Sequence, residues 1–487
     1  MNRRTFLKQS ILWTASAAVW SGCKTTAPRP AVSARRVLGA NEAIRVAVVG
    51  FGGRGQDHIN SFRALPNVRI AALCDADRSI LDRELRRCRD KGEQVEGFTD
   101  IRELLERAQV DVVSIATPNH WHSLAAIWAV QHGKDVYVEK PISHNVFEGR
   151  KVFEAARKYG AIVQTGTQCR SSAGLREAVP WIQAGNLGRI IRVRGLCYKR
   201  RASIGKTVGD QPIPESVDYN LWLGPAPMKP LRRARLHYDW HWVWDTGNGD
   251  LGNQGVHQVD IARWVLGVKT LSPAVLSIGG RLGYEDDGET PNTQIVFHDY
   301  KPAPLLFEVR GLPQKADSKE MDSYRGASIG VVVDCEGGSV VIPSYSRAIV
   351  YDKAGKEIRR FDGGGNHYEN FIQAVRSRRG ADLHSDALEG HLSAALCHTA
   401  NISYRLGHTG TPEAIRDAVK QKPEVAEMLG RMEEHLAANN VNLRQTPATL
   451  GLALRMDPRK EKFLGNRLAN EMLTRPYRAP FVVPERV

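Results

Sequence analysis

The stretch Gly50-Phe51-Gly52-Gly53-Arg54-Gly55 decides the fold of the N-terminal part of this chain. It follows an apolar segment, 44–50, that is typical of a buried strand, and a helix is expected next, at 57–65. In the pattern G-x-G-x-x-G the glycines let the backbone turn tightly and approach a pyrophosphate, which sits at the helix N-terminus. The sequence therefore predicts a dinucleotide-binding loop. Its expected cofactor contacts come from Gly50, Gly52, Gly53, Arg54 and Gly55.

The segments that follow alternate between the same two kinds of element. Apolar strands are expected at 68–74, 110–116, 135–139 and 161–165, with helices at 79–91, 124–132 and 146–159. Buried strands that alternate with helices indicate βαβ units and a parallel sheet. We therefore expect an α/β fold with a Rossmann dinucleotide-binding domain at 41–166.

After residue 188 the pattern changes to strands without regular helices between them. These strands are expected at 190–198, 274–282, 292–298, 305–310, 328–334 and 339–342, and helices return at 367–378 and 387–405. Such a run predicts a largely antiparallel sheet. We assign it to a second, α+β domain at 167–410, which carries substrate binding and oligomerisation, and a charged extension follows at 411–487.

An acidic residue follows the second expected strand. The carboxylate of Asp75 can accept hydrogen bonds from the hydroxyls of an adenine ribose. A negative charge there disfavours the 2′-phosphate of NADP, so NAD is the expected cofactor. Arg78 lies close enough in sequence to soften this preference, which leaves NADP open.

Two further motifs follow the carboxyl ends of expected strands. Thr117-Pro118-Asn119-His120 comes after the strand at 110–116, and Glu139-Lys140-Pro141 ends the strand at 135–139. Because ligands bind at this edge in open α/β sheets, both motifs are expected to contact the cofactor. The alternative for Lys140 is a solvated loop lysine.

Together these motifs resemble those of the Gfo/Idh/MocA oxidoreductases, the family of glucose–fructose oxidoreductase, inositol dehydrogenase and MocA. The resemblance covers about residues 44–407, and the segments 221–225 and 239–257 resemble an exported bacterial branch. It implies an open-faced antiparallel sheet that shapes the substrate site, and homo-oligomers built through that sheet. It also implies oxidation of a secondary alcohol of a sugar, polyol or glycoside.

The resemblance implies a catalytic Asp-x-x-x-His pair near the substrate carbon and the nicotinamide. His257 matches its histidine, and Asn253 stands at the aspartate position. Asparagine cannot take up a proton, so Asn253 can orient a hydroxyl but cannot serve as a base. A helix N-cap after Gly252 is the alternative for Asn253. On one helix Asn253, His257, Asp260 and Trp264 would share a face.

The proton chemistry then falls to His257 and Lys140. An imidazole titrates near neutral pH and can accept the hydroxyl proton, whereas a lysine ammonium can stabilise the developing alkoxide. The sequence does not decide which of the two is the primary base. Asp260 is expected either to hold the ring of His257 or to be an exposed or capping carboxylate.

Two clusters in the second domain bear on the substrate. The basic segments 198–201 and 232–235 would favour an anionic sugar such as a uronate if they face the cleft, and otherwise form a solvated surface. Trp240, His241, Trp242 and Trp244 would stack on a pyranose or belong to an aromatic core.

The N-terminus predicts export. Arg3-Arg4-Thr5-Phe6-Leu7-Lys8 precedes an apolar run at 11–20 and resembles a Tat-type signal, with a linker extending to residue 40. Cys23 is either a lipidation site or part of a simple cleavage region. We therefore expect a periplasmic enzyme, lipid-anchored if Cys23 is modified, that folds around its cofactor before export.

Composition narrows the partners. The formal net charge is +15, but no nucleic-acid motif accompanies it, so no nucleic-acid partner is expected. The seven cysteines include no CxxC pair, and no metal site is expected.

Two functions remain after this. The first is a sugar oxidoreductase with tightly retained NAD, and the alternative is a redox-neutral enzyme that cleaves glycosides through transient oxidation. Within the alternative, Glu139-Lys140-Pro141 weighs against the NAD-dependent α-N-acetylgalactosaminidases, which resemble the same family but are expected to lack this form.

Overall fold

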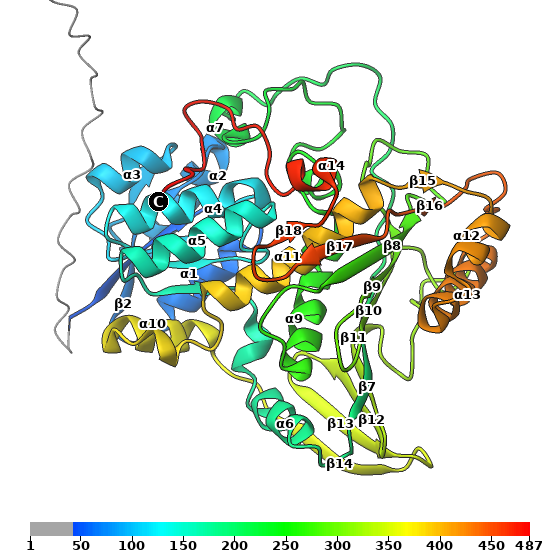
Figure 1. Ribbon diagram of the computed structural model, residues 1–487. Coiled ribbons are helices and arrows are strands. Elements are labelled where there is room, and N and C mark those ends of the chain that lie inside the picture. The colour runs from blue at the N-terminus through cyan, green and yellow to red at the C-terminus, as the bar shows by residue number, and fades with distance from the viewer. Residues whose placement is uncertain (1–41) are drawn as a thin grey trace, which may run out of the picture. The chain divides into compact units, whose positions relative to one another are not determined.

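The structure, a computed structural model, describes residues 42–487 (Figure 1). The expected export signal and Cys23 lie outside the described residues. Six cysteines fall within them, and all six are buried and free of disulfides. No helix in the described part is long and apolar enough to cross a membrane, and no group of acidic, histidine or cysteine side chains there is arranged to hold a metal ion.

The first domain is a six-stranded parallel sheet with helices on both faces. The strand order is β3-β2-β1-β4-β5-β6. Its strands are β1 (Ile44–Val49), β2 (Val68–Cys74), β3 (Glu96–Phe98), β4 (Val112–Ile115), β5 (Asp135–Val138) and β6 (Val163–Thr165). Its helices are α1 (Gly55–Arg63), α2 (Arg78–Asp90), α3 (Ile101–Arg107), α4 (Asn119–Gln131) and α5 (Val146–Lys158). β1 and β4 are apolar and buried on both faces, as a central parallel strand requires.

Two differences from the sequence expectation affect this domain. β3 and α3 were not expected, because both are short. The apolar residues of α3, Ile101, Leu104 and Leu105, have helical spacing, but seven residues are fewer than the window over which such a period is read. Helix α4 begins at Asn119, five residues earlier than expected. The Thr-Pro-Asn-His motif is therefore not a free loop, since its last two residues form the first turn of α4.

The second domain is built on a mostly antiparallel sheet. Its main order is β14-β13-β12-β11-β7-β10-β9-β8-β16-β15. The strands are β7 (Ile190–Tyr198), β8 (Ala274–Gly280), β9 (Thr293–His298), β10 (Leu305–Arg310), β11 (Ile329–Cys335), β12 (Gly338–Ser344), β13 (Arg347–Asp352), β14 (Glu357–Asp362), β15 (His408–Thr409), β16 (Thr449–Leu450), β17 (Leu454–Asp457) and β18 (Lys462–Phe463). Only the pair β7–β10 is parallel among the described strands of this sheet.

Helices α6 (Ala173–Gln183), α9 (Gly255–Leu266) and α11 (Ala387–Arg405) pack on this sheet, and α8 (Gly249–Asn253) directly precedes α9. Helix α10 (His367–Ser377) instead packs on α1 of the first domain, and α7 (Tyr219–Leu223) contacts Trp121 of α4. Helix α9 packs on β7, and α11 packs on both β8 and α5. Because α11 contacts both domains, it fixes the position of the substrate side of the cleft relative to the nucleotide-binding sheet (Figure 1).

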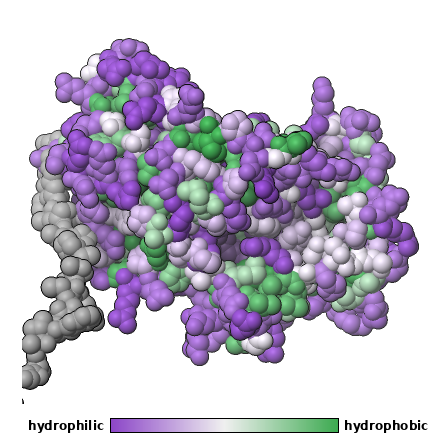
Figure 2. Space-filling view, turned by 90° about the horizontal axis from the view of Figure 1, so that it is seen from above, coloured by the Kyte–Doolittle hydropathy of each residue, from purple (hydrophilic) through white to green (hydrophobic). Residues whose placement is uncertain are grey.

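The outer face of the sheet is partly covered. Helices α12 (Pro412–Val419) and α13 (Pro423–Ala438) pack on β8, β9 and β10 through an apolar cluster that includes Phe297, Met428 and Met432. β14 is mostly exposed. The surface in Figure 2 is largely hydrophilic, with apolar residues in small separate groups.

The chain after β18 and α14 (Arg467–Glu471) returns to the first domain, where it is drawn in red (Figure 1). Phe481 is fully buried there and packs edge-on against Trp121 and at a tilted angle against Trp128, both in α4. Arg478 donates hydrogen bonds to the backbone and side-chain oxygens of Asn220 in α7. This segment therefore holds together two elements that border the cleft.

Candidate active site

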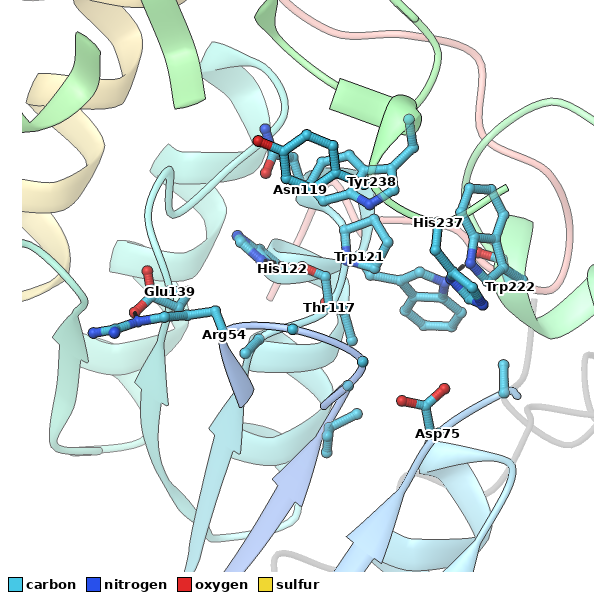
Figure 3. A pocket seen from close by; sticks show the side chains of 18 of the residues that line it. Arg54, Asp75, Thr117, Asn119, Trp121, His122, Glu139, Trp222, His237 and Tyr238 are labelled. Atoms are coloured by element: carbon cyan, nitrogen blue, oxygen red, sulfur yellow. Dashed lines mark hydrogen bonds and ion pairs between the residues drawn. The ribbon is translucent and has the colours of Figure 1, made fainter. Parts of the chain in front are cut away.

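A cavity of about 440 Å³ lies at the carboxyl ends of β1, β2, β4 and β5. This is the edge at which open α/β sheets bind ligands. The second domain forms the opposite wall with the end of β7, helix α7, the segment 237–241 and the α8–α9 junction. Figure 3 shows His237 and Tyr238 of that wall across the cavity from Asp75. The cavity therefore has one wall from each domain.

The glycine loop has the geometry that a pyrophosphate needs. Gly50 has φ +76°, and a Cβ there would lie 2.8 Å from the backbone of Thr117. A Cβ on Gly55 would lie 2.1 Å from the carbonyl oxygen of Gly50. A Cβ on Gly53, by contrast, would meet no atom within 4 Å. The turn is thus closed behind and open toward the cavity at the N-terminus of α1, so its residues fit a bound dinucleotide.

Asp75 supports this loop and faces the cavity. Its Oδ2 accepts the backbone N–H of Phe51 in the glycine loop, and its Oδ1 accepts the N–H of Asp77, both at 3.0 Å. Burial raises the pKa of Asp75, although these two hydrogen bonds oppose the rise. Each oxygen keeps a lone pair for a ribose hydroxyl.

Glu139 and Arg54 are tied to each other beside the loop. Arg54 Nε donates to Glu139 Oε1 at 3.1 Å, and the ring of His58 bonds the same oxygen at 3.1 Å. Burial alone would raise the pKa of Glu139, but His58, Lys140 and Arg54 hold it well below its usual range. Glu139 is therefore an ionised carboxylate that lines the cavity. Most of its hydrogen-bond acceptor sites are already occupied by neighbouring side chains.

The Thr-Pro-Asn-His motif divides between cavity and core. Thr117, Pro118 and Asn119 line the cavity. His120 does not line it, which corrects the expectation of a cofactor contact: its ring bonds the backbone oxygens of Trp222 and Thr246. His122, which sequence reasoning missed, lines the cavity instead.

Lys140 and Asn253 meet inside the cavity. Lys140 Nζ donates to the backbone oxygen of Asn253 at 3.2 Å and to its Oδ1 at 3.4 Å. Burial lowers the pKa of Lys140, and the positive charges of Arg54 and Lys199 act in the same direction. Glu139 opposes this without cancelling it. Lys140 is thus a lysine that gives up its proton more readily than a solvated one.

His257 is close to this pair but buried. It lies in α9, does not line the cavity and is 5 % exposed. Its Nδ1 has no hydrogen-bond partner among the described residues, and its ring centroid is 5.0 Å from that of Tyr345. Burial and Lys140 hold the pKa of His257 well below its usual range. His257 is therefore a neutral imidazole.

Three expectations for this region are wrong. Asn253 ends α8, and α9 begins at Gly255, so Asn253, His257, Asp260 and Trp264 do not share one continuous helix. Asn253 is consequently not an N-cap. Asp260 neither contacts His257 nor is exposed: it accepts two hydrogen bonds from Arg170, at 2.8 and 2.9 Å, and one from Ser393.

Some residues of the basic and aromatic clusters line the cavity, and others pack elsewhere. Lys199 and Arg201 line the cavity, as do Trp240 and His241. Trp242 packs against Arg201, and Trp244 packs against Arg405. Arg232 pairs with the exposed Asp210, Arg235 pairs with the buried Asp239, and Arg233 packs against Trp222.

The sequence analysis assigned no role in the site to several other residues that line the cavity. They are Trp121, His122, Trp222, His237, Tyr238 and Gln254.

Comparison with known proteins agrees with this geometry. Residues 44–167 match the family model described as an oxidoreductase family with an NAD-binding Rossmann fold. Residues 183–299 match the C-terminal alpha/beta domain of the same family. The chain belongs to the Gfo/Idh/MocA oxidoreductase family. NAD is thus the cofactor of its first domain.

Individual relatives share parts of the chain. It is 32% identical over 172 residues to an α-N-acetylgalactosaminidase of Shewanella oneidensis, and 33% identical over 172 residues to the glycosyl hydrolase family 109 protein 1 of a Shewanella species. Each match covers 32% of this chain and 37% of the relative, so the chain spans little more than a third of these proteins.

Among solved structures, the WlbA dehydrogenase of Bordetella pertussis, in complex with NADH and UDP-GlcNAcA, superposes with a TM-score of 0.54 at 20% identity. This match covers 73% of the chain and 94% of that structure, and it supports the two-domain fold.

Proposed function

We propose that this enzyme oxidises a secondary alcohol of a sugar, polyol or glycoside with NAD. The observation that carries the proposal is Lys140, a half-buried lysine of lowered pKa that contacts Asn253 in the cavity lined by the glycine loop. A general base works best when its pKa lies near the operating pH, and burial is the usual way to bring a lysine there.

Lys140, Asn253 and His257 have different roles in this reaction. NAD, when bound, supplies a hydride acceptor at its nicotinamide ring. The neutral amine of Lys140 removes the hydroxyl proton, and its ammonium form then stabilises the charge that remains on the oxygen. The side chain of Asn253, which contacts Lys140, orients the hydroxyl. His257 stays neutral and adds no positive charge next to Lys140.

A redox-neutral glycoside-cleaving enzyme is the second candidate. The names of the curated relatives favour it, although they match only part of the chain. Oxidation to a ketone would acidify the neighbouring C–H. Once Lys140 has passed the hydroxyl proton to solvent, its amine would remove this second proton, and the aglycone would leave and be protonated. Water would then add to the resulting double bond, and return of the hydride and a proton to the ketone would restore the alcohol. The expectation that Glu139-Lys140-Pro141 weighs against the α-N-acetylgalactosaminidase subtype stays a prediction. Incubation with a panel of sugars and aryl glycosides separates the two candidates by product: a ketone or a released aglycone.

We further propose that the enzyme is exported with NAD already bound and acts in the periplasm, anchored by lipid if Cys23 is modified. The twin-arginine N-terminus supports export, and the C-terminal segment supports retention. Phe481 and Arg478 hold α4 and α7, and both helices contribute residues to the cavity wall.

An oligomer through the second sheet would have to use the side of β12, β13 and β14, because α12 and α13 cover β8, β9 and β10.

Protein purified without added cofactor is expected to release NAD or NADH on acid extraction. The reason is that Phe481 and Arg478 fasten α4 and α7, which line the cavity, so we expect bound NAD to leave slowly. Phe481→Ala should therefore release NAD faster, whereas Leu468→Ala, on the exposed helix α14, should not. Wild-type protein that contains no nicotinamide and rebinds it weakly would contradict retention.

Asp75→Ala is expected to weaken NAD binding by about 1.5–3 kcal/mol, the usual worth of hydrogen bonds to a charged group. Isothermal calorimetry on cofactor-stripped protein measures the loss. Asp75→Asn keeps one acceptor for the loop, so comparing the two variants separates loop support from ribose binding. Asp90→Ala, at the exposed end of α2, is the matched control. Unchanged affinity in both Asp75 variants would mean that this carboxylate does not touch the ribose.

The rate of NAD reduction is expected to rise with pH through the pKa of Lys140. The neutral amine is the active form, and its pKa is lowered from 10.5, so the rise should come at a lower pH than for a solvated lysine. His257 is already neutral over this range and adds no second inflection. Single-turnover rates across pH test this, and a rate that falls with rising pH would contradict the assignment.

A further inference from the structure

The substrate end of the cavity holds more positive charge than its neighbours neutralise. Lys140, Lys199 and Arg201 all line it. Arg201 is neutralised by Asp250, which accepts from its Nε at 3.0 Å and from its Nη2 at 2.8 Å. Neither lysine forms an ion pair with any residue between 42 and 487. Two lysine amino groups therefore reach the cavity with only neutral hydrogen-bond partners.

Lys199 is held in place rather than free to move into solvent. Its Nζ donates to Oε1 of Gln254 at 2.9 Å. Nε2 of Gln254 in turn donates to the hydroxyl of Tyr345 at 2.6 Å. Burial and Arg201 lower the pKa of Lys199, and Asp250 opposes this without cancelling it. A cation fixed in this way has its remaining N–H groups available to an incoming acceptor.

The position of Lys199 relative to the reacting centre follows from the chain. Lys140 is bound by Asn253, and Lys199 is bound by the next residue, Gln254. The two amino groups therefore approach the same junction between α8 and α9. If Lys140 acts on the reacting hydroxyl, an anion at Lys199 belongs to the same sugar ring or to its direct substituent.

We propose that the substrate carries a carboxylate on its sugar ring, as a uronate does, and that Lys199 binds this carboxylate. The proposal rests on the proposed function, because it takes Lys140 as the residue at the reacting carbon. A phosphate fits this end less well. A phosphate monoester carries about 1.5 to 2 negative charges at neutral pH, whereas Lys199 offers one positive charge beside an Arg201 that Asp250 already neutralises.

Binding to NAD-loaded protein tests the proposal directly. The probes are D-glucuronate and D-galacturonate, their methyl esters, which lack the charge, and glucose 6-phosphate. Calorimetry gives the affinities, and single-turnover reduction of bound NAD gives kcat/KM where reaction occurs. The variants are Lys199→Gln, Lys199→Arg, which keeps the charge, and Lys206→Gln, which removes a lysine from the exposed surface.

The expected result is that a uronate binds more tightly than its ester and that Lys199→Gln reduces this preference about 10- to 100-fold. Lys199→Arg should retain part of it, and Lys206→Gln should leave it intact. Equal binding of acid and ester, equal losses for both in Lys199→Gln, or tighter binding of glucose 6-phosphate would each overturn the proposal. Uronate binding that depends on Lys199 without any hydride transfer would support the subsite and remove the oxidoreductase function.

Discussion

Lys140→Ala is expected to lower the rate at which a bound sugar reduces NAD by about 10²- to 10⁴-fold, the usual worth of a positioned general base. The variant loses the group that takes the hydroxyl proton, while the glycine loop and Asp75 keep their contacts with each other. Cofactor occupancy should therefore stay close to that of the wild type. Single-turnover absorbance of the reduced nicotinamide, measured together with NAD content, separates the two effects.

Two controls make this result specific to the amine. Lys151→Ala removes a lysine from α5 that pairs with Glu154, outside the cavity, and should leave the rate unchanged. Added small primary amines should restore part of the activity of Lys140→Ala, because they can occupy the space of the missing group and accept the same proton. A rate within about threefold of the wild type would assign the proton transfer to another residue.

Most of the nucleotide-binding half could be predicted from sequence because its signals are local. An apolar strand, a glycine turn and a helix follow one another within about twenty residues, and the structure places Gly50, Gly52 and Asp75 around one cavity. The same local logic predicted α11 with its observed bounds, since a long periodic helix carries many equivalent signals.

The substrate half could not be predicted to the same depth because its contacts are long-range. His120 and His122 are two residues apart in the first turn of α4, so they point in different directions, and only the packing of Trp222 and Thr246 shows which one faces the core. His237 and Tyr238 enter the cavity from a segment without a regular element or motif. No sequence pattern marks such positions.

Asp260 is a charged example of a contact that sequence spacing could not predict. Its position three residues after His257 suggested that it holds the histidine ring, whereas its partner, Arg170, is 90 residues away in sequence. The side chains of Asp260 and Arg170 are 0% and 5% exposed. A buried ion pair of this kind holds α9 against the segment after β6, and its role is structural.

Asp260→Asn is therefore expected to destabilise the fold by about 3–5 kcal/mol, because it leaves the guanidinium of Arg170 buried without its compensating charge. Glu389 also contacts Arg170, at 2.9 Å, and keeps the loss from being larger. Chemical denaturation measures the change in unfolding free energy. Single-turnover reduction of NAD, normalised to folded protein, should remain close to the wild-type rate, because Asp260 does not contact His257 or line the cavity.

The exposed pair of Arg189 and Glu336 provides the matched control. Glu336→Gln makes the same acid-to-amide change and also breaks a pair with an arginine, but solvent compensates both charges, so the unfolding midpoint should not move measurably. The opposite result would support the hypothesis from the sequence that Asp260 holds the ring of His257. If Asp260→Asn kept its stability and lost most of its turnover, the carboxylate would have to act on His257, and the geometry around Arg170 would not describe the working enzyme.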